Sequence, residues 1–238
     1  MTADDDALPP LPPVDPAGAA RLPGEAITPE LLAGLLADGD DELASWVLEQ
    51  ALADADRVAV YDGLLSDAMS LVGERWENGQ WSVAEEHLAS QTLLRALDRV
   101  RPRPGPDGRI GPLAVLAGVA GEQHMLGLVC LGHVLVERGW TVSNLGADVP
   151  TPDLVRFLAR NEAGMLALSA SDPDRVDAVV EAVHAARATR RQLPIMIGGR
   201  LTAMPDRLRG LDVQLVEPSL AAAVTLADDM LARLLART

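Results

Sequence analysis

Residues 113–127 of the chain, LAVLAGVAGEQHMLG, decide the fold. The first part, 113–120, is an apolar run bounded by a proline and a glycine, which predicts a fully buried central strand of a parallel sheet. An amphipathic helix is expected from the histidine onward. Glu122 and His124 therefore lie in the loop between the carboxyl end of a strand and a helix, which is where open α/β sheets bind ligands.

His124 is the first candidate functional residue. A loop histidine beside a carboxylate, here Glu122, can offer one ring nitrogen to a metal while the acid orients the other nitrogen. A single loop histidine is usually structural or solvated, so the pattern needs support from the rest of the chain. Asp148 ends the second predicted strand at the same edge of the sheet. It is expected either to contact a ligand there or to cap the following helix near Thr151.

Alternating strands and helices fill residues 113–238. Strands are predicted at 113–120, 140–146, 164–169, 194–198 and 212–216, and helices at 124–138, 151–161, 173–190, 204–209 and 219–236. Repeated βα units imply one parallel sheet with helices on both faces. The expected fold class is α/β, with a flavodoxin-like (Rossmann-type) five-stranded parallel domain.

The sequence before this domain has a different pattern. Residues 1–25 are rich in proline and aspartate and are expected to be a disordered or loosely docked acidic arm. Residues 26–100 show helical periodicity, with capping residues at Thr28, Asp40 or Asp41, Asp56 and Ser82. Four helices with short connections predict an antiparallel four-helix bundle, joined to the α/β domain by a linker over 101–112.

Composition narrows the classes of function. The net charge of −15 argues against direct binding to nucleic acid, which needs a basic face. No apolar run reaches the length of a membrane span, and the N-terminus lacks the pattern of a signal peptide. The single cysteine, Cys130, falls on an apolar helix face and is expected to be a core residue. We therefore expect a cytoplasmic protein with neither a membrane nor a nucleic acid as partner.

Three short motifs turn the histidine loop into a longer pattern: Glu122-x-His124-x-x-Gly127, then Ser169-x-Ser171, then Gly198-Gly199. The second and third lie at the ends of predicted strands. The pattern resembles the cobalamin-binding sequence D-x-H-x-x-G, S-x-L, G-G of methionine synthase, the corrinoid proteins and the carbon-skeleton mutases, and the spacings match.

This resemblance implies a role for each motif. His124 would be the lower cobalt ligand in place of dimethylbenzimidazole, Ser169 would bond the displaced nucleotide tail, and the glycine pair would leave room for that tail. The chain departs from the pattern twice. Glu122 replaces the usual aspartate, which should lengthen its contact with the histidine. Ser171 replaces the usual leucine, which affects only a contact along the tail.

A second group of candidate residues lies in the bundle. Trp76, at the end of the predicted third helix, is followed after nine residues by Glu86 and His87 in the first turns of the fourth helix. The turn between the helices would bring the three side chains to one end of the bundle. Each has an ordinary explanation alone, either as a core tryptophan or as a solvated helix start.

Before a cobalamin-binding domain, this bundle resembles the light-sensing adenosylcobalamin regulators of the CarH/LitR type. The resemblance implies that Trp76 packs over the adenosyl group and that Glu86 and His87 contact it. Those regulators carry an N-terminal DNA-binding domain where this chain has an acidic arm. They also carry a cobalt-capturing histidine where this chain has Glu77. Similar stand-alone photoreceptors, the photocobilins, also bind a bilin. Biliverdin here would be noncovalent, because Cys130 is badly placed for a thioether link.

The combined prediction is a light-sensing adenosylcobalamin photoreceptor module and not an enzyme. Light would cleave the cobalt–carbon bond and the bundle would shift. The signal would then pass to an unknown protein partner or would change the oligomeric state of the protein, for example that of a homodimer. The alternative from the enzyme class is a corrinoid methyl-carrier protein of a methyltransferase system, although a methyl group needs no large aromatic lid. A flavodoxin-like domain without cobalamin is a third interpretation, which the spacings of Ser169 and Gly198-Gly199 disfavour.

Overall fold

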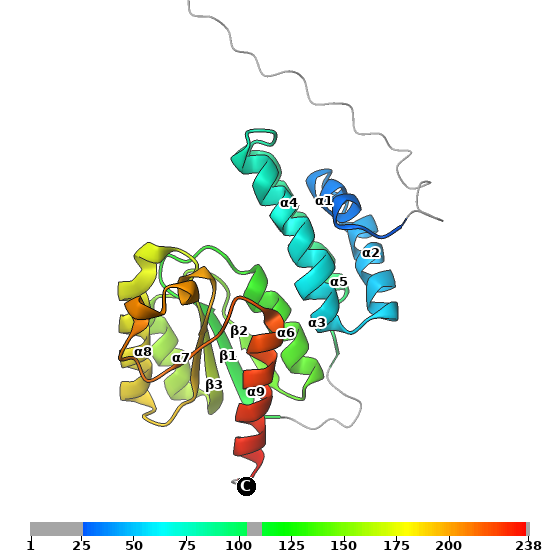
Figure 1. Cartoon of the computed structure of the whole chain (residues 1–238). Helices are drawn as coiled ribbons and strands as arrows, with labels where there is room; N and C mark the ends of the chain where they lie inside the picture. Colours follow the sequence, from blue (N-terminus) through cyan, green and yellow to red (C-terminus); the bar gives the residue numbers. More distant parts are fainter. Residues whose placement is uncertain (1–25, 104–110, 237–238) are drawn as a thin grey trace, which may run out of the picture.

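The computed structural model describes residues 26–103 and 111–236, and it begins with a helical part, residues 26–100, which we call the cap (Figure 1). Its elements are α1 (Pro29–Ala37), α2 (Asp41–Asp54), α3 (Arg57–Val60), the π-helical turn η2 (Tyr61–Leu65), α4 (Ser66–Glu77) and α5 (Val83–Arg99). Because α3, η2 and α4 follow one another without a break, the cap has the four helical rods predicted. The arm predicted for 1–25 and most of the predicted linker lie outside the described residues.

Polar side chains start the rods of the cap as predicted. Thr28 and Asp40 accept hydrogen bonds from backbone N–H groups three residues further on, at 3.2 and 2.9 Å. Asp56 does the same at 3.0 Å, and Ser82 forms a reciprocal capping box with Glu85. These bonds satisfy amide groups that the first turn of a helix leaves without partners.

Five parallel strands form the α/β domain: β1 (Leu113–Gly118), β2 (Thr141–Asn144), β3 (Ala163–Ser169), β4 (Ile195–Gly198) and β5 (Gln214–Leu215). Their order in the sheet is β2-β1-β3-β4-β5, which is the flavodoxin-like doubly wound order. The predicted fold class is therefore confirmed. The predicted strand 212–216 shrinks to two residues, both exposed, at the edge of the sheet.

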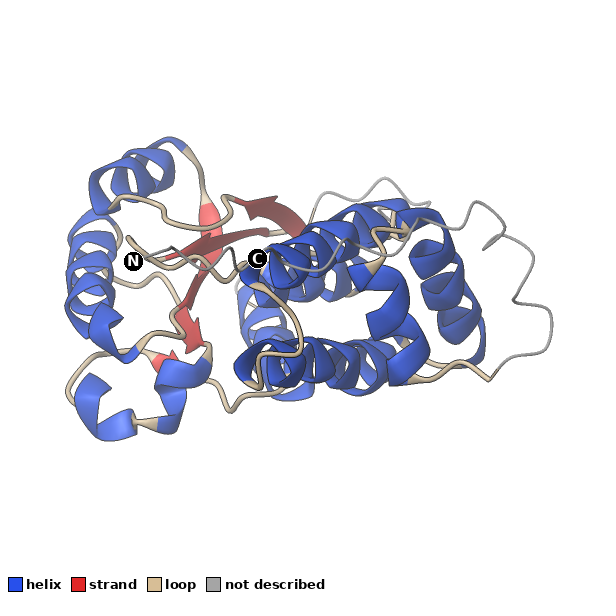
Figure 2. Cartoon of the chain, turned by 90° about the horizontal axis from the view of Figure 1, so that it is seen from above, coloured by secondary structure: helices blue, strands red, loops and turns tan. Residues whose placement is uncertain are grey.

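Helices cover both faces of the sheet (Figure 2). On one face lie α6 (Leu126–Glu137) and α9 (Leu220–Leu235), and on the other lie α7 (Thr151–Arg160) and α8 (Val176–Thr189). Short 3-10 turns, η3 (Pro173–Arg175) and η5 (Pro205–Leu208), replace part of the helices predicted at 173–190 and 204–209, and a third, η4 (Arg200–Ala203), lies before the second of them, where no helix was predicted. Side chains alternate along β1, so Leu116 joins the core under α6 and α9 while Val115 joins the core under α7 and α8.

The cap packs on the side of the domain formed by α6 and α9 (Figure 1). Its buried leucines belong to the same continuous apolar core as the buried residues of these two helices. Cys130 lies in this core as predicted, and burial raises the pKa of its thiol to about 12. No helix in the described ranges, 26–103 and 111–236, combines the length and the apolar character that crossing a membrane requires.

A buried histidine at this junction makes the fold sensitive to acid. His133 on α6 bonds the hydroxyl of Tyr61, and burial, helped by the nearby Arg57, lowers the pKa of His133 to about 4 from the ordinary 6.5. The unfolded chain therefore takes up a proton as the pH falls below 6.5, while the folded chain does so only near pH 4. The stability is complete above pH 6.5 and is lost as the pH falls.

We expect the free energy of unfolding to drop by about 2 kcal/mol between pH 7 and pH 5 because of this one group. Urea unfolding of the parent and of His133→Gln at pH 7, 6 and 5 measures the drop. The variant should show a flatter pH profile, because glutamine does not titrate. The lowered pKa of Glu122 acts only below about pH 4.5, outside this window. Equal slopes for parent and variant would contradict the assignment.

Candidate functional site

Glu122 and His124 lie in the loop between β1 and α6, as predicted, and they contact each other directly. The Nδ1 of His124 lies 2.6 Å from one carboxylate oxygen of Glu122, and the same oxygen accepts the backbone N–H of His124 at 2.8 Å. The Glu122 side chain is 1% exposed, whereas that of His124 is 64% exposed. The acid is therefore fixed beneath the surface, and within the described residues the Nε2 of this largely exposed imidazole has no hydrogen-bond partner.

Backbone amides keep Glu122 ionised. Burial alone would raise the pKa of this carboxyl, but hydrogen bonds from the backbone N–H groups of His124 and Ser171, together with the imidazole, hold it below its ordinary value. A buried carboxylate beside Nδ1 favours a proton on that nitrogen and a free lone pair on Nε2, the form that binds metals. The expected lengthening caused by glutamate in place of aspartate is not seen, because the contact is a direct hydrogen bond.

The predicted serine and glycines lie at the carboxyl ends of adjacent strands. Ser169 on β3 is paired in register with Gly118 on β1 and with Gly198 on β4. A Cβ atom added to Gly198 would meet no atom within 4 Å, and the same holds for Gly127 in the first turn of α6. These two glycines therefore border open space rather than packed protein.

Gly199 has a different role from its neighbour. Its φ of +96° is a conformation that favours glycine, and an added Cβ would collide with the carbonyl oxygen of Ala170. Gly199 is needed for the turn after β4, whereas Gly198 leaves room at the edge of the sheet. Gly198 and Gly199 were predicted together to leave room for a nucleotide tail, but the two glycines have different structural roles.

Asp148 joins two loops of this edge. Its carboxylate accepts the backbone N–H of Gly121 at 2.6 Å, and its own N–H donates to the carbonyl of Glu122 at 2.8 Å. Helix α7 starts at Thr151 without a side-chain cap, so the alternative that Asp148 caps this helix is wrong. Neither Gly121 as a partner of Asp148 nor the backbone of Ser171 as a partner of Glu122 was predicted from the residue types. The positive φ of Asp148, +50°, is a feature that the residue types alone do not reveal.

The arrangement suits a metal that is held mainly by an organic ligand. Among the described residues, no three His, Cys, Asp or Glu side chains gather to bind a bare ion. His124 offers a single imidazole nitrogen, and one axial protein ligand is enough where a macrocycle supplies the other donors. The open space beside Gly127 and Gly198 fits an extended arm of such a ligand. These residues therefore fit cobalamin, for which His124 would be the residue that holds the cobalt and Ser169 the residue beside the nucleotide tail.

The second predicted group lies at one end of the cap. Trp76 is in the last turn of α4, while Glu86 and His87 are in the first turns of α5. Trp76 is 45% exposed, and the His87 side chain, 72% exposed, has its Nε2 3.5 Å from the Glu86 carboxylate. Within the described ranges, no hydrogen bond or ion pair joins these three side chains to Glu122 or His124. The helix–turn–helix thus brings the cap residues to one end, facing outward.

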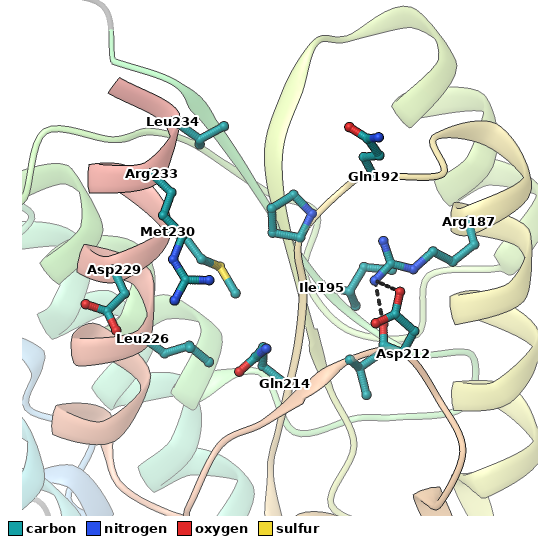
Figure 3. A pocket seen from close by; sticks show the side chains of 12 residues that line it. Arg187, Gln192, Ile195, Asp212, Gln214, Leu226, Asp229, Met230, Arg233 and Leu234 are labelled. Atoms are coloured by element: carbon teal, nitrogen blue, oxygen red, sulfur yellow. Dashed lines mark hydrogen bonds and ion pairs between the residues drawn. The ribbon is translucent and has the colours of Figure 1, made fainter. Parts of the chain in front are cut away.

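A separate pocket lies at the opposite edge of the sheet, between α8 and α9 (Figure 3). It is lined by the start of β4, by the segment before β5 and by α9. Within it, Arg187 forms an ion pair with Asp212 at 3.1 Å. None of the predicted site residues lines this pocket, so it is not part of the candidate site.

Comparisons with known proteins agree with this geometry. A family model described as a B12 binding domain matches residues 112–226, and a second model with the same description matches the cap, residues 30–101. The HTH-type transcriptional repressor CarA of Myxococcus xanthus is 34% identical over 169 residues, which cover 68% of this chain and 54% of the repressor. The repressor CarH of the same organism is 32% identical over 162 residues, which cover 67% of this chain and 53% of the repressor. The chain therefore spans about half the length of these relatives.

Corrinoid proteins are also similar. Trimethylamine corrinoid protein 1 of Methanosarcina acetivorans is 27% identical over 140 residues, which cover 57% of this chain and 64% of that protein. The structure of the Methanosarcina barkeri monomethylamine corrinoid protein superposes with a TM-score of 0.65 at 18% identity, covering 84% of this chain and 96% of that one. This last likeness concerns the fold alone. With the histidine loop and both matched domains, the chain belongs to the cobalamin-binding proteins in which a helical B12-binding cap precedes a B12-binding domain.

Proposed function

We propose that this chain is a light-sensing module in which the cap recognises the upper ligand of adenosylcobalamin. The observation that supports the proposal is the exposed end of the cap, where Trp76 is in the last turn of α4 and Glu86 and His87 are in the first turns of α5. An indole offers a broad apolar face to an adenine ring, and a carboxylate and an imidazole can hydrogen-bond a ribose or the edge of a base. A methyl group would need none of these.

The relatives support the adenosyl form. Both repressors are about one-third identical over some two thirds of this chain. In addition, the pattern of Trp76, Glu86 and His87 resembles that of the CarH/LitR type. The names of these relatives describe longer proteins, so repression is not carried over to this chain. Output through a protein partner or a change in oligomer, a bilin as second chromophore and a cytoplasmic location remain predictions.

Each residue of the two sites has a part in this function. Bound adenosylcobalamin supplies a cobalt–carbon bond that visible light can break. His124 would hold the cobalt, and Glu122 would keep the imidazole oriented through the contact it already makes. Trp76, Glu86 and His87 would hold the adenosyl group, so loss of that group would remove contacts that keep the cap in place.

The second candidate function is a methyl-carrying corrinoid protein. It is favoured by the similarity to the trimethylamine corrinoid protein and by the shared fold with the monomethylamine corrinoid protein. Both functions use the same lower site, so only the upper ligand distinguishes them.

A tryptophan substitution tests the proposal against this rival. Trp76→Ala should lower the affinity for adenosylcobalamin by roughly tenfold to a hundredfold, because stacking of a base on an aromatic side chain contributes about 1–3 kcal/mol. The affinity for methylcobalamin should stay within about twofold of the parent, since a methyl group gives the indole no face to stack on. Absorption titrations with both cobalamins measure the two affinities.

The matched control is Trp46→Ala, which removes another partly exposed tryptophan of the cap, 38% exposed on α2. It should leave both affinities unchanged. Equal losses for the two cobalamins in Trp76→Ala would instead favour the methyl carrier.

A further inference from the structure

Three residues of one helix attach the cap to the α/β domain by polar contacts. The Nε of Arg57 donates to Glu137 of α6 at 2.7 Å, and the hydroxyl of Tyr61 lies 2.9 Å from the Nδ1 of His133 on the same helix. At the next residue, both carboxylate oxygens of Asp62 accept backbone N–H groups at the start of α9, from Leu220 at 2.7 Å and Ala221 at 2.9 Å. The α3–η2 segment therefore contacts both helices on this face of the domain.

Arg57 also joins two helices of the cap to each other where they meet α6. Its Nη1 donates to the hydroxyl of Tyr61 at 2.8 Å and to the carbonyl of Val100, at the end of α5, at 3.1 Å. Because the Tyr61 hydroxyl accepts from the guanidinium, its own proton is available to His133 Nδ1. The helix that begins the third rod and the end of the fourth rod are thus fixed together where they meet α6.

The contact occurs at the π-helical turn. Tyr61 and Asp62 are the first two residues of η2, and the wider winding of this turn changes the direction of the side chains that follow it. The same rod continues through α4 to Trp76, roughly 20 Å along the helix axis at 1.5 Å per residue. The rod is therefore attached to the α/β domain near its first end and carries a candidate ligand-binding residue near its other end, so a change of angle at the attachment would move that residue.

Only one of the two domain helices contacted by the α3–η2 segment, α6, is tied directly to the site. Helix α6 begins at Leu126, two residues after His124, so its position is tied to that of the lower ligand. The start of α9 has amide groups that would otherwise lack partners, and Asp62 supplies them from across the domain boundary, whereas Ser219 supplies Ala222 from within its own domain at 3.0 Å.

We propose that Arg57, Tyr61 and Asp62 form the pivot by which the cap is attached to the face of the domain formed by α6 and α9, with Asp62 as the positioning residue that sets the angle of the cap. Both oxygens of Asp62 bond the two amides only in one placement of the cap relative to α9. The consequence for ligand preference rests on the function proposed above. The placement of the cap does not.

The test compares Asp62→Ala with Ser219→Ala in the full chain loaded with adenosylcobalamin in the dark. Both substitutions remove bonds to the first amides of α9 and should have a similar cost in helix stability, but only the first crosses the domain boundary. Two exposed positions, Glu49 in α2 and Glu181 in α8, are changed to cysteine and carry nitroxide labels. Pulsed electron paramagnetic resonance then measures the distance between the cap and the domain. Cys130 is buried with a raised pKa and stays unlabelled.

Asp62→Ala should shift or broaden the distance distribution, while Ser219→Ala should keep that of the parent. Asp62→Asn, which retains an acceptor oxygen, should lie between the parent and Asp62→Ala and serves if the alanine variant fails to fold. A parent-like distribution in folded Asp62→Ala would overturn the pivot, and so would an equal shift in Ser219→Ala.

The ratio of affinities for adenosylcobalamin and methylcobalamin separates the pivot from the proposed function. The ratio should fall toward one in Asp62→Ala and stay at the parent value in Ser219→Ala. A shifted distance with an unchanged ratio supports the pivot and counts against ligand recognition by the cap. An unchanged distance with a lowered ratio overturns the pivot.

Discussion

His124→Ala is expected to lower the affinity for cobalamin by more than about a hundredfold. The Nε2 of His124 is the nitrogen that the loop offers to a metal, and Glu122 already fixes the ring in the required orientation. Loss of a residue that merely orients a metal ligand costs 10–100-fold in affinity, so loss of the ligand should cost more. The absorption spectrum of any residual complex should change as well, because the lower nitrogen of the cobalt would be a different group.

Titration of the purified protein with adenosylcobalamin, followed by absorption, measures this effect. His184→Ala is the matched control, because His184 lies exposed on α8 rather than in the loop between β1 and α6. Glu122→Gln should give a smaller loss of about 10–100-fold, since the imidazole remains but loses its carboxylate partner. An unchanged affinity and spectrum in His124→Ala would remove His124 from the site.

Gly198→Val is expected to abolish most cobalamin binding while leaving the fold intact. The added side chain would enter the open space at the end of β4, where a Cβ meets no protein atom within 4 Å, and valine suits a strand. If the nucleotide tail passes beside Ser169 and Gly198, the valine would occupy its space. Circular dichroism and urea unfolding should match the parent, and the cobalamin titration should not.

Gly199→Ala provides the contrast. At a φ of +96° and with the Ala170 carbonyl in the way, alanine should destabilise the protein by about 1–3 kcal/mol before any cofactor is added. The two variants would thus distinguish two effects: Gly198→Val lowers cobalamin binding by filling the ligand's space, and Gly199→Ala lowers stability by straining the turn. Normal binding by Gly198→Val would show that the tail runs elsewhere.

Much of the fold can be predicted from the sequence because its signals are local. An apolar run ending at a glycine predicts β1, and the capping side chains of Thr28, Asp40 and Ser82 predict the helix starts, since both depend on neighbouring residues. The lower site follows for the same reason, because Glu122 and His124 are two residues apart and belong to one loop.

The features that were missed depend on residues distant in sequence. The bond from Asp148 to Gly121 and the bond from the Ser171 amide to Glu122 exist only once the loops meet at the edge of the sheet. The π-helical turn has no residue pattern of its own that marks it. The contacts that Tyr61 and Asp62 of this turn make with α6 and α9 involve residues seventy or more positions away in the chain, so neighbouring residues do not predict them.

Small-angle X-ray scattering of the adenosylcobalamin-loaded protein, in the dark and after green light, tests the central claim most directly. The proposal predicts that the scattering profile changes on illumination, because loss of the adenosyl group removes the contacts of Trp76, Glu86 and His87 that hold the cap. Protein loaded with hydroxocobalamin should give one profile in the dark and in the light. An unchanged profile of the adenosylcobalamin form, although its absorption spectrum shows that the adenosyl group has been lost, would contradict light sensing by the cap.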